Sequence, residues 1–177
     1  HHFLAALRRN VDITLLANTT QTYGLTKGQA SPTTAQGQKT KAQPEGSEPE
    51  AFHPVAVAVA MNAGFVARSF AGMEDLTTDL IVKAVRHEGF ALVDILQPCV
   101  SFNKVNTFKW YKDRCTEIED DYDPSDRKAA LAKAFEWGDS IPVGVIYENS
   151  RKPLASGVAD PEKPHAEMVE DVLSEYF

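Results

Sequence analysis

The sequence contains short, nearly continuous apolar runs of strand length, separated by stretches in which apolar residues recur at helical spacing. The runs are DITLLA at 12–17, GFVARSF at 64–70 and FALVDIL at 90–96. A continuous apolar run of this length is typical of a strand that is buried on both faces, as in a parallel sheet covered by helices on either side. Any fold for this chain therefore needs a central sheet with covered faces.

Amphipathic segments fill the intervals between these runs. Residues 2–9 end on Arg8 and Arg9, and cations are favourable at the carbonyl end of a helix. Residues 73–88 have the same helical spacing, and we expect their inward side to consist of Leu76, Leu80, Ile81, Ala84 and Val85. After an irregular stretch from Gln97, we expect a helix over 125–137, a strand over 141–147 and a terminal helix over 166–176. The alternation predicts an α/β fold with a mainly parallel sheet flanked by helices.

The segment HPVAVAVAMNAG, residues 53–64, is compatible with two structures. Its alternation of Val and Ala fits a strand. Its alanine content, its length and the closing Gly64 favour a helix that ends in a glycine cap. We predict a helix.

The composition excludes several classes of protein. With 177 residues, of which 43% are hydrophobic, the chain has the size of one domain. The formal net charge of -7 argues against a nucleic-acid partner, because phosphate binding needs clustered Lys and Arg that no predicted face offers. Two cysteines are too few for a disulfide framework, so we expect a reducing, cytoplasmic setting. No apolar run approaches the ~20 residues that span a bilayer, and we expect no membrane association.

The polar stretch NTTQTYGLTKGQASPTT, residues 18–34, has two interpretations. Its content of Gly, Ser, Thr, Pro and Gln is typical of a flexible linker. However, it follows the strand at 12–17, and ligands of open α/β sheets bind beyond the carboxyl ends of the strands. Its hydroxyls, glycine amides and Lys27 could hold a magnesium diphosphate. We expect residues 35–50 to be mobile and of low complexity.

Several other polar residues have a plain structural interpretation. Cys99 follows the strand at 90–96 and would share an edge with the polar stretch, but a lone cysteine is usually a small core residue. Arg68 on a strand more often marks an ion pair than a substrate clamp. Trp110 and Tyr111 could offer a stacking surface, although such pairs more often serve packing. The scattered histidines have no spacing that would bring two metal ligands together: His2, His53, His87 and His165.

Seven segments resemble, in this order, the β subunit of 2-oxoacid:ferredoxin oxidoreductases: HFLAALRRN, DITLL, TYGLTKGQASPTT, FVARSF, FALVDILQPC, FNKVNTFKWY and EWGDSIPVGVIY. The resemblance extends to about Asn149, and YGLTKGQ-SPTT together with LQPC-FNKVNT-WY is specific. It implies a partial thiamine diphosphate-binding domain over 1–149, with a carboxyl-terminal β-subunit extension from about residue 97. Residues 150–177 are then a tail.

The resemblance implies a subunit that binds thiamine diphosphate and Mg2+. The implied reaction is the oxidative decarboxylation of a 2-oxoacid, 2-oxoglutarate or pyruvate, to an acyl-coenzyme A, with electrons passing through a 4Fe-4S cluster to ferredoxin. The implied partners are an α subunit, ferredoxin, coenzyme A and the 2-oxoacid. The cofactor carries the carbanion chemistry, and the protein supplies position, metal and electrostatics.

The resemblance also implies metal ligands. In the family, a side chain three positions before the Tyr of the YG motif and the carbonyl just before that Tyr bind the metal. Those positions are Thr20 and Thr22 in this chain. The cysteine of LQPC is one of four cluster ligands in the family, which gives Cys99 that role. Cys115 matches no ligand position.

We place Lys27, Gly28 and Gln29 at the diphosphate or at the substrate. Lys27 is also a plausible cation for a second substrate carboxylate, which favours 2-oxoglutarate or broad 2-oxoacid use. The family's Gly-Asp-Gly metal motif, its three other cluster cysteines and a catalytic glutamate have no counterpart here, so we expect that upstream sequence is missing. Two alternatives therefore stay open: a non-catalytic remnant or assembly module, and another thiamine diphosphate enzyme such as an acetolactate synthase.

Overall fold

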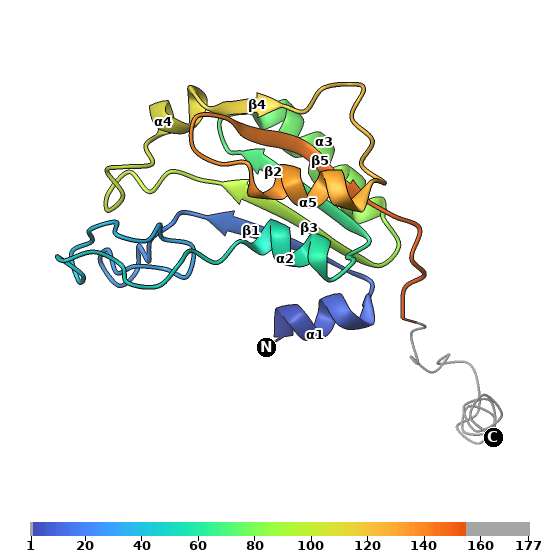
Figure 1. Ribbon diagram of the computed structural model, residues 1–177, viewed down its shortest axis with the longest axis horizontal. Coiled ribbons are helices and arrows are strands. Elements are labelled where there is room, and N and C mark those ends of the chain that lie inside the picture. The colour runs from blue at the N-terminus through green and yellow to red at the C-terminus, as the bar shows by residue number, and fades with distance from the viewer. Residues whose placement is uncertain (1, 155–177) are drawn as a thin grey trace, which may run out of the picture.

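A five-stranded sheet with the order β1-β3-β2-β5-β4 organises residues 2–154, which are the residues that the computed structural model describes (Figure 1). The strands are β1 (Ile13–Thr19), β2 (Phe65–Phe70), β3 (Phe90–Leu96), β4 (Cys115–Glu117) and β5 (Ile141–Glu148). β1, β3 and β2 run parallel, β5 is antiparallel to β2, and β4 is parallel to β5. The sheet is therefore mainly parallel, as predicted. The two central strands β2 and β3 are buried at every position.

Helices cover both faces of the sheet (Figure 1). On one face, an apolar cluster joins the sheet to α1 (His2–Arg9), α2 (Pro54–Ala60) and α5 (Arg127–Phe135). On the other face, a second cluster joins it to α3 (Glu74–Arg86). A third, smaller cluster packs Tyr111 of α4 (Phe108–Lys112) against Phe70, Leu96 and Ile141 at the ends of their strands. The predicted α/β fold with flanking helices is confirmed.

The helix over HPVAVAVAMNAG is confirmed, but its end is not the predicted glycine. Asn62 adopts a left-handed conformation with φ 58°, and the amides of Asn62 and Ala63 donate to the carbonyls of Val59 and Ala58. These two bonds form the usual helix-ending motif, in which Asn can replace Gly. Gly64 instead leaves room for the side chain of His87, because a Cβ at position 64 would lie 2.2 Å from Nε2 of His87.

Other predictions for this region are corrected in detail. Val85 of α3 is 65% exposed rather than inward, because it lies at the edge of a stripe centred on Leu80 and Ala84. β1 continues to Thr19, two residues past the predicted end, because Asn18 and Thr19 still pair with β3. Two short elements, α4 and β4, were not predicted at all. The predicted terminal helix over 166–176 lies outside the described residues.

The segment 35–50, expected to be mobile, follows a defined path in the structure. The amide of Gly37 donates to the carbonyl of Ser47, and the amide of Ser47 donates to the carbonyl of Gln38. The side-chain oxygen of Gln43 accepts from the amide of Ala30, at 3.1 Å. The segment therefore forms a folded loop and not a linker.

None of the helices within residues 2–154 has both the length and the apolar character needed to cross a membrane.

Asn10 ties three distant parts of the chain together. It follows α1 in a left-handed conformation, with φ 52°, and is completely buried. Its Oδ1 accepts from the amide of Phe90, at 3.0 Å, where β3 begins. Its Nδ2 donates to the carbonyls of Arg151 and Lys152, each at 3.0 Å. One side chain thus fixes α1, β3 and the segment after β5.

We predict that Asn10→Ala lowers the free energy of unfolding by about 2–4 kcal/mol, because it leaves buried backbone groups without hydrogen-bond partners. It also places an alanine, whose side chain cannot form a local hydrogen bond, in a left-handed conformation. Urea denaturation of this chain measures the change. Asn18→Ala is the matched control, because Asn18 is exposed and its loss should change stability by less than about 0.5 kcal/mol. A loss below about 1 kcal/mol for Asn10→Ala would contradict the assignment.

Candidate functional site

The carboxyl ends of β1 and β3 bring two loops together. Figure 1 shows the loop after β1 and the segment after β3 on the same side of the sheet. The Cys99 sulfur lies 3.9 Å from the point where Gly24 would carry a Cβ, and Nδ2 of Asn103 donates to the carbonyl of Thr20, at 3.3 Å. The predicted proximity of Cys99 to the polar loop is thus confirmed, and the arrangement follows from parallel strands ending at one edge.

A hydrogen bond brings an oxygen of Thr20 and an oxygen of Thr22 together. The Thr20 hydroxyl donates to the carbonyl oxygen of Thr22, at 2.8 Å. Two neighbouring ligands of an octahedral Mg2+, each at about 2.1 Å from the ion, are roughly 3 Å apart. The oxygen pair therefore has the chemistry and the spacing of two adjacent magnesium ligands. The Thr22 hydroxyl is not part of this pair, because it donates to the carbonyl of Gln29, at 3.0 Å.

Residues 23–29 form a tight turn that uses its own amides. The amide of Lys27 donates to the carbonyl of Gly24, and the amide of Gly28 donates to the carbonyl of Tyr23. Gly28 has φ +93°, and a Cβ there would approach the ring of Phe102 to 3.1 Å. The expected Gly28 amide donor for a diphosphate is therefore engaged within the turn, and Gly28 shapes the loop instead. The side chains of Lys27 and Gln29 are exposed.

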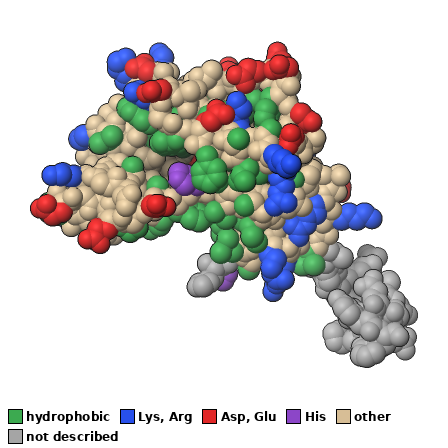
Figure 2. Space-filling view, viewed as in Figure 1, with side chains coloured by type: hydrophobic (Ala, Val, Ile, Leu, Met, Phe, Trp, Pro, Cys, Tyr) green, Lys and Arg blue, Asp and Glu red, His purple; other side chains and the backbone are tan. Residues whose placement is uncertain are grey.

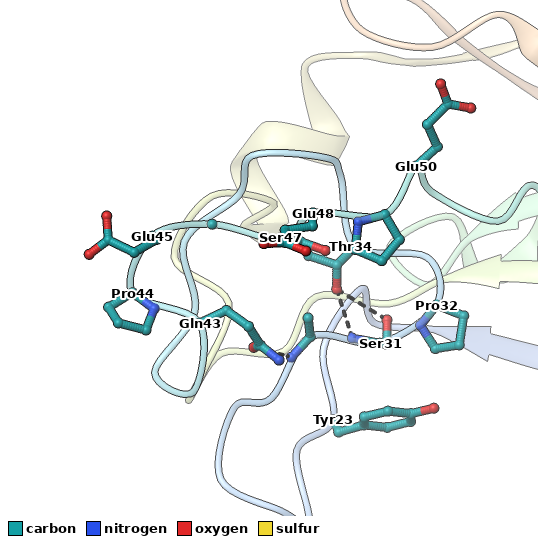
Figure 3. Close-up of a pocket in the computed structure, with 13 residues that line it drawn as sticks. Tyr23, Ser31, Pro32, Thr34, Gln43, Pro44, Glu45, Ser47, Glu48 and Glu50 are labelled. Atoms are coloured by element: carbon teal, nitrogen blue, oxygen red, sulfur yellow. Dashed lines mark hydrogen bonds between the residues drawn. The ribbon is translucent and has the colours of Figure 1, made fainter.

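A hollow of about 550 Å3 lies inside the folded loop, lined by Tyr23, Ala30, Ser31, Pro32, Thr34 and Gln43–Glu50 (Figure 3). Thr34 fixes part of the lining, because its hydroxyl accepts from the amide of Ser31, at 2.8 Å, and donates to the carbonyl of Gln21, at 2.7 Å. Glu45, Glu48 and Glu50 belong to its wall, and Figure 2 shows acidic side chains over this end of the molecule. So many carboxylates disfavour a phosphate or a carboxylate ligand here.

A second, smaller pocket lies between α2 and the sheet, and its residues were not predicted as a site. We call it the Arg68 pocket; it has a volume of about 170 Å3 and is lined by Thr19, Gln21, His53, Arg68, Asp94 and Trp137, among others. Arg68 and Asp94 occupy paired positions on β2 and β3. The signal available in the sequence was a charged residue inside each of two largely apolar strands, FVARSF and FALVDIL.

Burial dominates the electrostatics of the Arg68 pocket. Asp94 is 3% exposed, and burial raises the pKa of its carboxyl, although the Thr19 hydroxyl donates to Oδ1 at 2.5 Å. Burial also lowers the pKa of Arg68. The guanidinium of Arg68 donates to the carbonyl of Ala134 near the end of α5, at 2.7 Å. Within residues 2–154 Arg68 has no carboxylate within ion-pair distance, so the expected ion pair is not found.

The remaining candidates behave as structural residues. Trp110 and Tyr111 pack edge to face with ring centroids 5.1 Å apart, and Tyr111 is fully buried, as the packing interpretation predicts. Burial raises the pKa of the Cys115 thiol to about 11, which makes it a poor thiolate ligand. Among the described residues, no three His, Cys, Asp or Glu side chains gather as a metal site. His165 lies outside those residues.

Two family models match this chain. One, described as "Thiamine pyrophosphate enzyme, C-terminal TPP binding domain", matches residues 1–95, which is more than half of the chain. The other describes the carboxyl-terminal part of the pyruvate ferredoxin oxidoreductase β chain and matches residues 99–161.

Similar proteins are named as β subunits. Subunit beta of 2-oxoacid:ferredoxin oxidoreductase 1 from Aeropyrum pernix is 44% identical over 162 residues, which are 85% of this chain and 51% of that protein. The β subunit of a 2-oxoacid:ferredoxin oxidoreductase from Sulfolobus sp. is 41% identical over 163 residues, 86% of this chain and 53% of that protein. The chain thus spans about half the length of the curated relatives it matches.

A solved structure has the same fold. It is a 2-oxoglutarate:ferredoxin oxidoreductase from Magnetococcus marinus with 2-oxoglutarate, coenzyme A and succinyl-CoA bound. It matches with a TM-score of 0.85 at 33% identity, over 97% of this chain and 56% of that one. The chain therefore belongs to the thiamine pyrophosphate enzymes, among the β subunits of the 2-oxoacid:ferredoxin oxidoreductases.

Proposed function

We propose that this chain is the part of a β subunit that binds thiamine diphosphate through Mg2+ in an oxidoreductase that decarboxylates a 2-oxoacid to an acyl-coenzyme A. The observation that carries the proposal is the 2.8 Å separation of the Thr20 hydroxyl and the Thr22 carbonyl oxygen at the carboxyl end of β1. The family match over residues 1–95 supports the cofactor. The α subunit, ferredoxin and coenzyme A are the proposed partners, in line with the names of the similar proteins and the bound molecules named for the solved one.

In this proposal, the residues of this chain position the metal ion, the cofactor and the substrate. Thr20 and Thr22 would offer their oxygens to the ion, and the exposed side chains of Lys27 and Gln29, in the turn that follows, could contact the diphosphate or the substrate. When bound, thiamine diphosphate supplies the carbanion chemistry and accepts the electrons left by carbon dioxide. The engaged amides of residues 27 and 28 keep the turn rigid, so the loop does not need to order itself on binding.

Cys99 is the proposed protein ligand of a 4Fe-4S cluster in this chain. It is half-buried against the Thr20–Gln29 loop, so a cluster bound there would lie next to the proposed cofactor site. The only other cysteine of the sequence, Cys115, is on β4. Because a cluster of this type is usually held by four thiolates, the remaining ligands would have to come from outside this sequence.

Thr20→Ala should weaken the binding of thiamine diphosphate with Mg2+ to the assembled oxidoreductase by at least about tenfold, because it removes one oxygen of the pair. Thr20→Ser keeps the hydroxyl and should restore most of the affinity. Calorimetric titration measures both. Thr26→Ala is the control, because Thr26 is exposed in the same loop. Equal affinity in Thr20→Ala and the control would rule out Thr20 as a ligand.

Cys99→Ser in the assembled oxidoreductase should reduce its iron content and its visible absorbance, because serine is a poor replacement for a cluster thiolate. Cys115→Ser is the matched control and should leave both unchanged. An iron assay on the purified protein measures the change. Full iron content in Cys99→Ser would show that Cys99 is not a cluster ligand. Absence of iron from the unmodified oxidoreductase would favour another kind of thiamine enzyme.

Lys27→Ala should lower the ratio of kcat/KM for 2-oxoglutarate to that for pyruvate by roughly tenfold or more, since a charged hydrogen bond to a second carboxylate contributes about 1.5–3 kcal/mol. Lys39→Ala, another exposed lysine of the same long loop, is the control. Steady-state rates of the intact complex with both oxoacids give the ratio. If the ratio does not move, Lys27 does not select the substrate.

A further inference from the structure

Asn103 is a buried side chain that uses all of its hydrogen-bonding capacity. It is 3% exposed. Its Oδ1 accepts from the amides of Val105, at 3.0 Å, and Asn106, at 2.9 Å. Its Nδ2 donates to the carbonyl of Thr20, at 3.3 Å, and to Oδ1 of Asn106, at 3.2 Å. An asparagine amide has two acceptor sites and two donor hydrogens, so this network uses every one of them.

The partners fix the orientation of the Asn103 amide. A backbone N–H can only donate, and a backbone carbonyl can only accept. Oδ1 of Asn103 therefore faces the amides of Val105 and Asn106, and Nδ2 faces the carbonyl of Thr20. The opposite orientation would set an oxygen against the Thr20 carbonyl and hydrogens against two N–H groups. The contact with Thr20 thus belongs to the arrangement that satisfies all of these backbone groups.

The two ends of this amide serve different parts of the chain. The Oδ1 end is local, because it closes a turn over residues 103–106. The backbone amide of Asn103 donates to the carbonyl of Cys99, at 3.0 Å, so this turn is tied to the backbone of Cys99. The Nδ2 end reaches Thr20, which is 83 positions away in the chain. One side chain therefore joins the backbone of Cys99 to that of Thr20.

This contact is the one hydrogen bond between residues 20–34 and residues 98–107 in the part of the chain that the structure describes. Side chains of the second loop also pack against Gly24 and Gly28. Van der Waals contacts of that kind are individually weak and do not set an orientation. The hydrogen bond to Thr20 is therefore the contact that defines how the two loops lie against each other.

We propose that Asn103 is a positioning residue, which fixes the proposed metal ligand Thr20 relative to the proposed cluster ligand Cys99. Its Nδ2 holds the carbonyl of Thr20, and the hydroxyl of the same threonine donates to the carbonyl of Thr22. The backbone that carries this oxygen pair thus has a fixed place beside Cys99. The role of the contact in cofactor binding rests on the proposed function, whereas the contact itself does not.

Two variants remove the contact in different ways. Asn103→Asp keeps Oδ1, and with it the turn over 103–106, but replaces the donor by an acceptor. Asn103→Ser is neutral and can still accept from an amide two residues further on, but its side chain is too short to reach Thr20. A result that both variants share is due to the lost contact and not to the added charge. Thermal melting verifies that each variant is folded, and either one keeps the test valid if the other is not.

Asn149→Asp and Asn149→Ser are the matched controls. Asn149 makes the same two kinds of bond, because its Nδ2 donates to the carbonyl of Ala63, at 2.6 Å, and its Oδ1 accepts from the amide of Arg151, at 2.8 Å. It follows β5, whose last residue pairs with the first residue of β2, and so lies at the opposite edge of the sheet from Thr20. The controls therefore measure what the loss of such a bond does to the fold in general.

The first measurement is the rate at which iodoacetamide alkylates Cys99 in the assembled oxidoreductase stripped of iron, thiamine diphosphate and Mg2+. Both Asn103 variants should raise this rate about two- to tenfold, which is the change in a local opening equilibrium that the loss of one hydrogen bond produces. Cys115, which is also half-buried and lies on β4, should react at an unchanged rate. Mass spectrometry of the two peptides separates the rates. The Asn149 controls should leave both rates unchanged.

The second measurement is the affinity for thiamine diphosphate with Mg2+, by calorimetric titration of the complex that retains its iron. Residues that orient a metal ligand typically contribute tenfold or more to metal affinity, so both Asn103 variants should bind about tenfold more weakly. The Asn149 controls should bind as the unmodified complex does.

The proposal is overturned if the Cys99 rate in the Asn103 variants equals that in the controls. It is also overturned if the Cys115 rate rises in parallel, because Asn103 then only stabilises the fold, or if the Asn103 variants bind the cofactor normally. Normal cofactor binding by the unmodified complex, with an unchanged Cys99 rate in the variants, refutes this inference alone. The expected Cys99 rates, in an unmodified complex that does not bind the cofactor, support the fixed contact and refute the proposed function alone.

Discussion

Strands β2 and β3 are buried on both faces, and this leaves their polar side chains only the interior of the protein to interact with. Arg68 and Asp94 are charged residues in such positions, and they face the same side of the sheet. Burying a charge is costly unless it is hydrogen-bonded, so the surrounding chain must supply partners. Ala134 on α5 and Thr19 on β1 do this, which connects the helix layer and the edge strand to the centre of the sheet.

The sequence was sufficient for the elements whose own pattern decides their structure. The apolar runs predicted β1, β2, β3 and β5, and helical spacing predicted α1, α3 and α5. The short elements α4 and β4 were missed, because α4 has only five residues and β4 three, too few for a periodic pattern. They exist because Thr107 caps α4 and because β5 offers β4 an edge to pair with. A short stretch of sequence does not show such tertiary contacts.

The candidate site could be predicted only in part, for a similar reason. The family resemblance, which the comparisons confirm, pointed to Thr20, Thr22 and Cys99, and the carboxyl-edge rule placed Cys99 beside the loop. It could not show that the amide of Gly28 is already engaged by Tyr23, since that depends on the closed shape of the turn. Nor could the resemblance show that Arg68, Asp94 and Gln21 line one pocket, because their proximity follows from strand register and from the course of a long loop.

The tetrapeptide TTQT at 19–22 connects the proposed metal ligands with the Arg68 pocket. The chain is no longer extended after Thr19, because Gln21 adopts a left-handed conformation with φ 53°. Thr19 and Gln21 line the Arg68 pocket, and the Thr20 hydroxyl donates to the Thr22 carbonyl. The Thr19 hydroxyl is held by Asp94 and the carbonyl of Gln21 by Thr34, so the backbone between them has little freedom. The contacts that hold Thr19 and Gln21 at the pocket therefore also fix the backbone that carries Thr20 and Thr22.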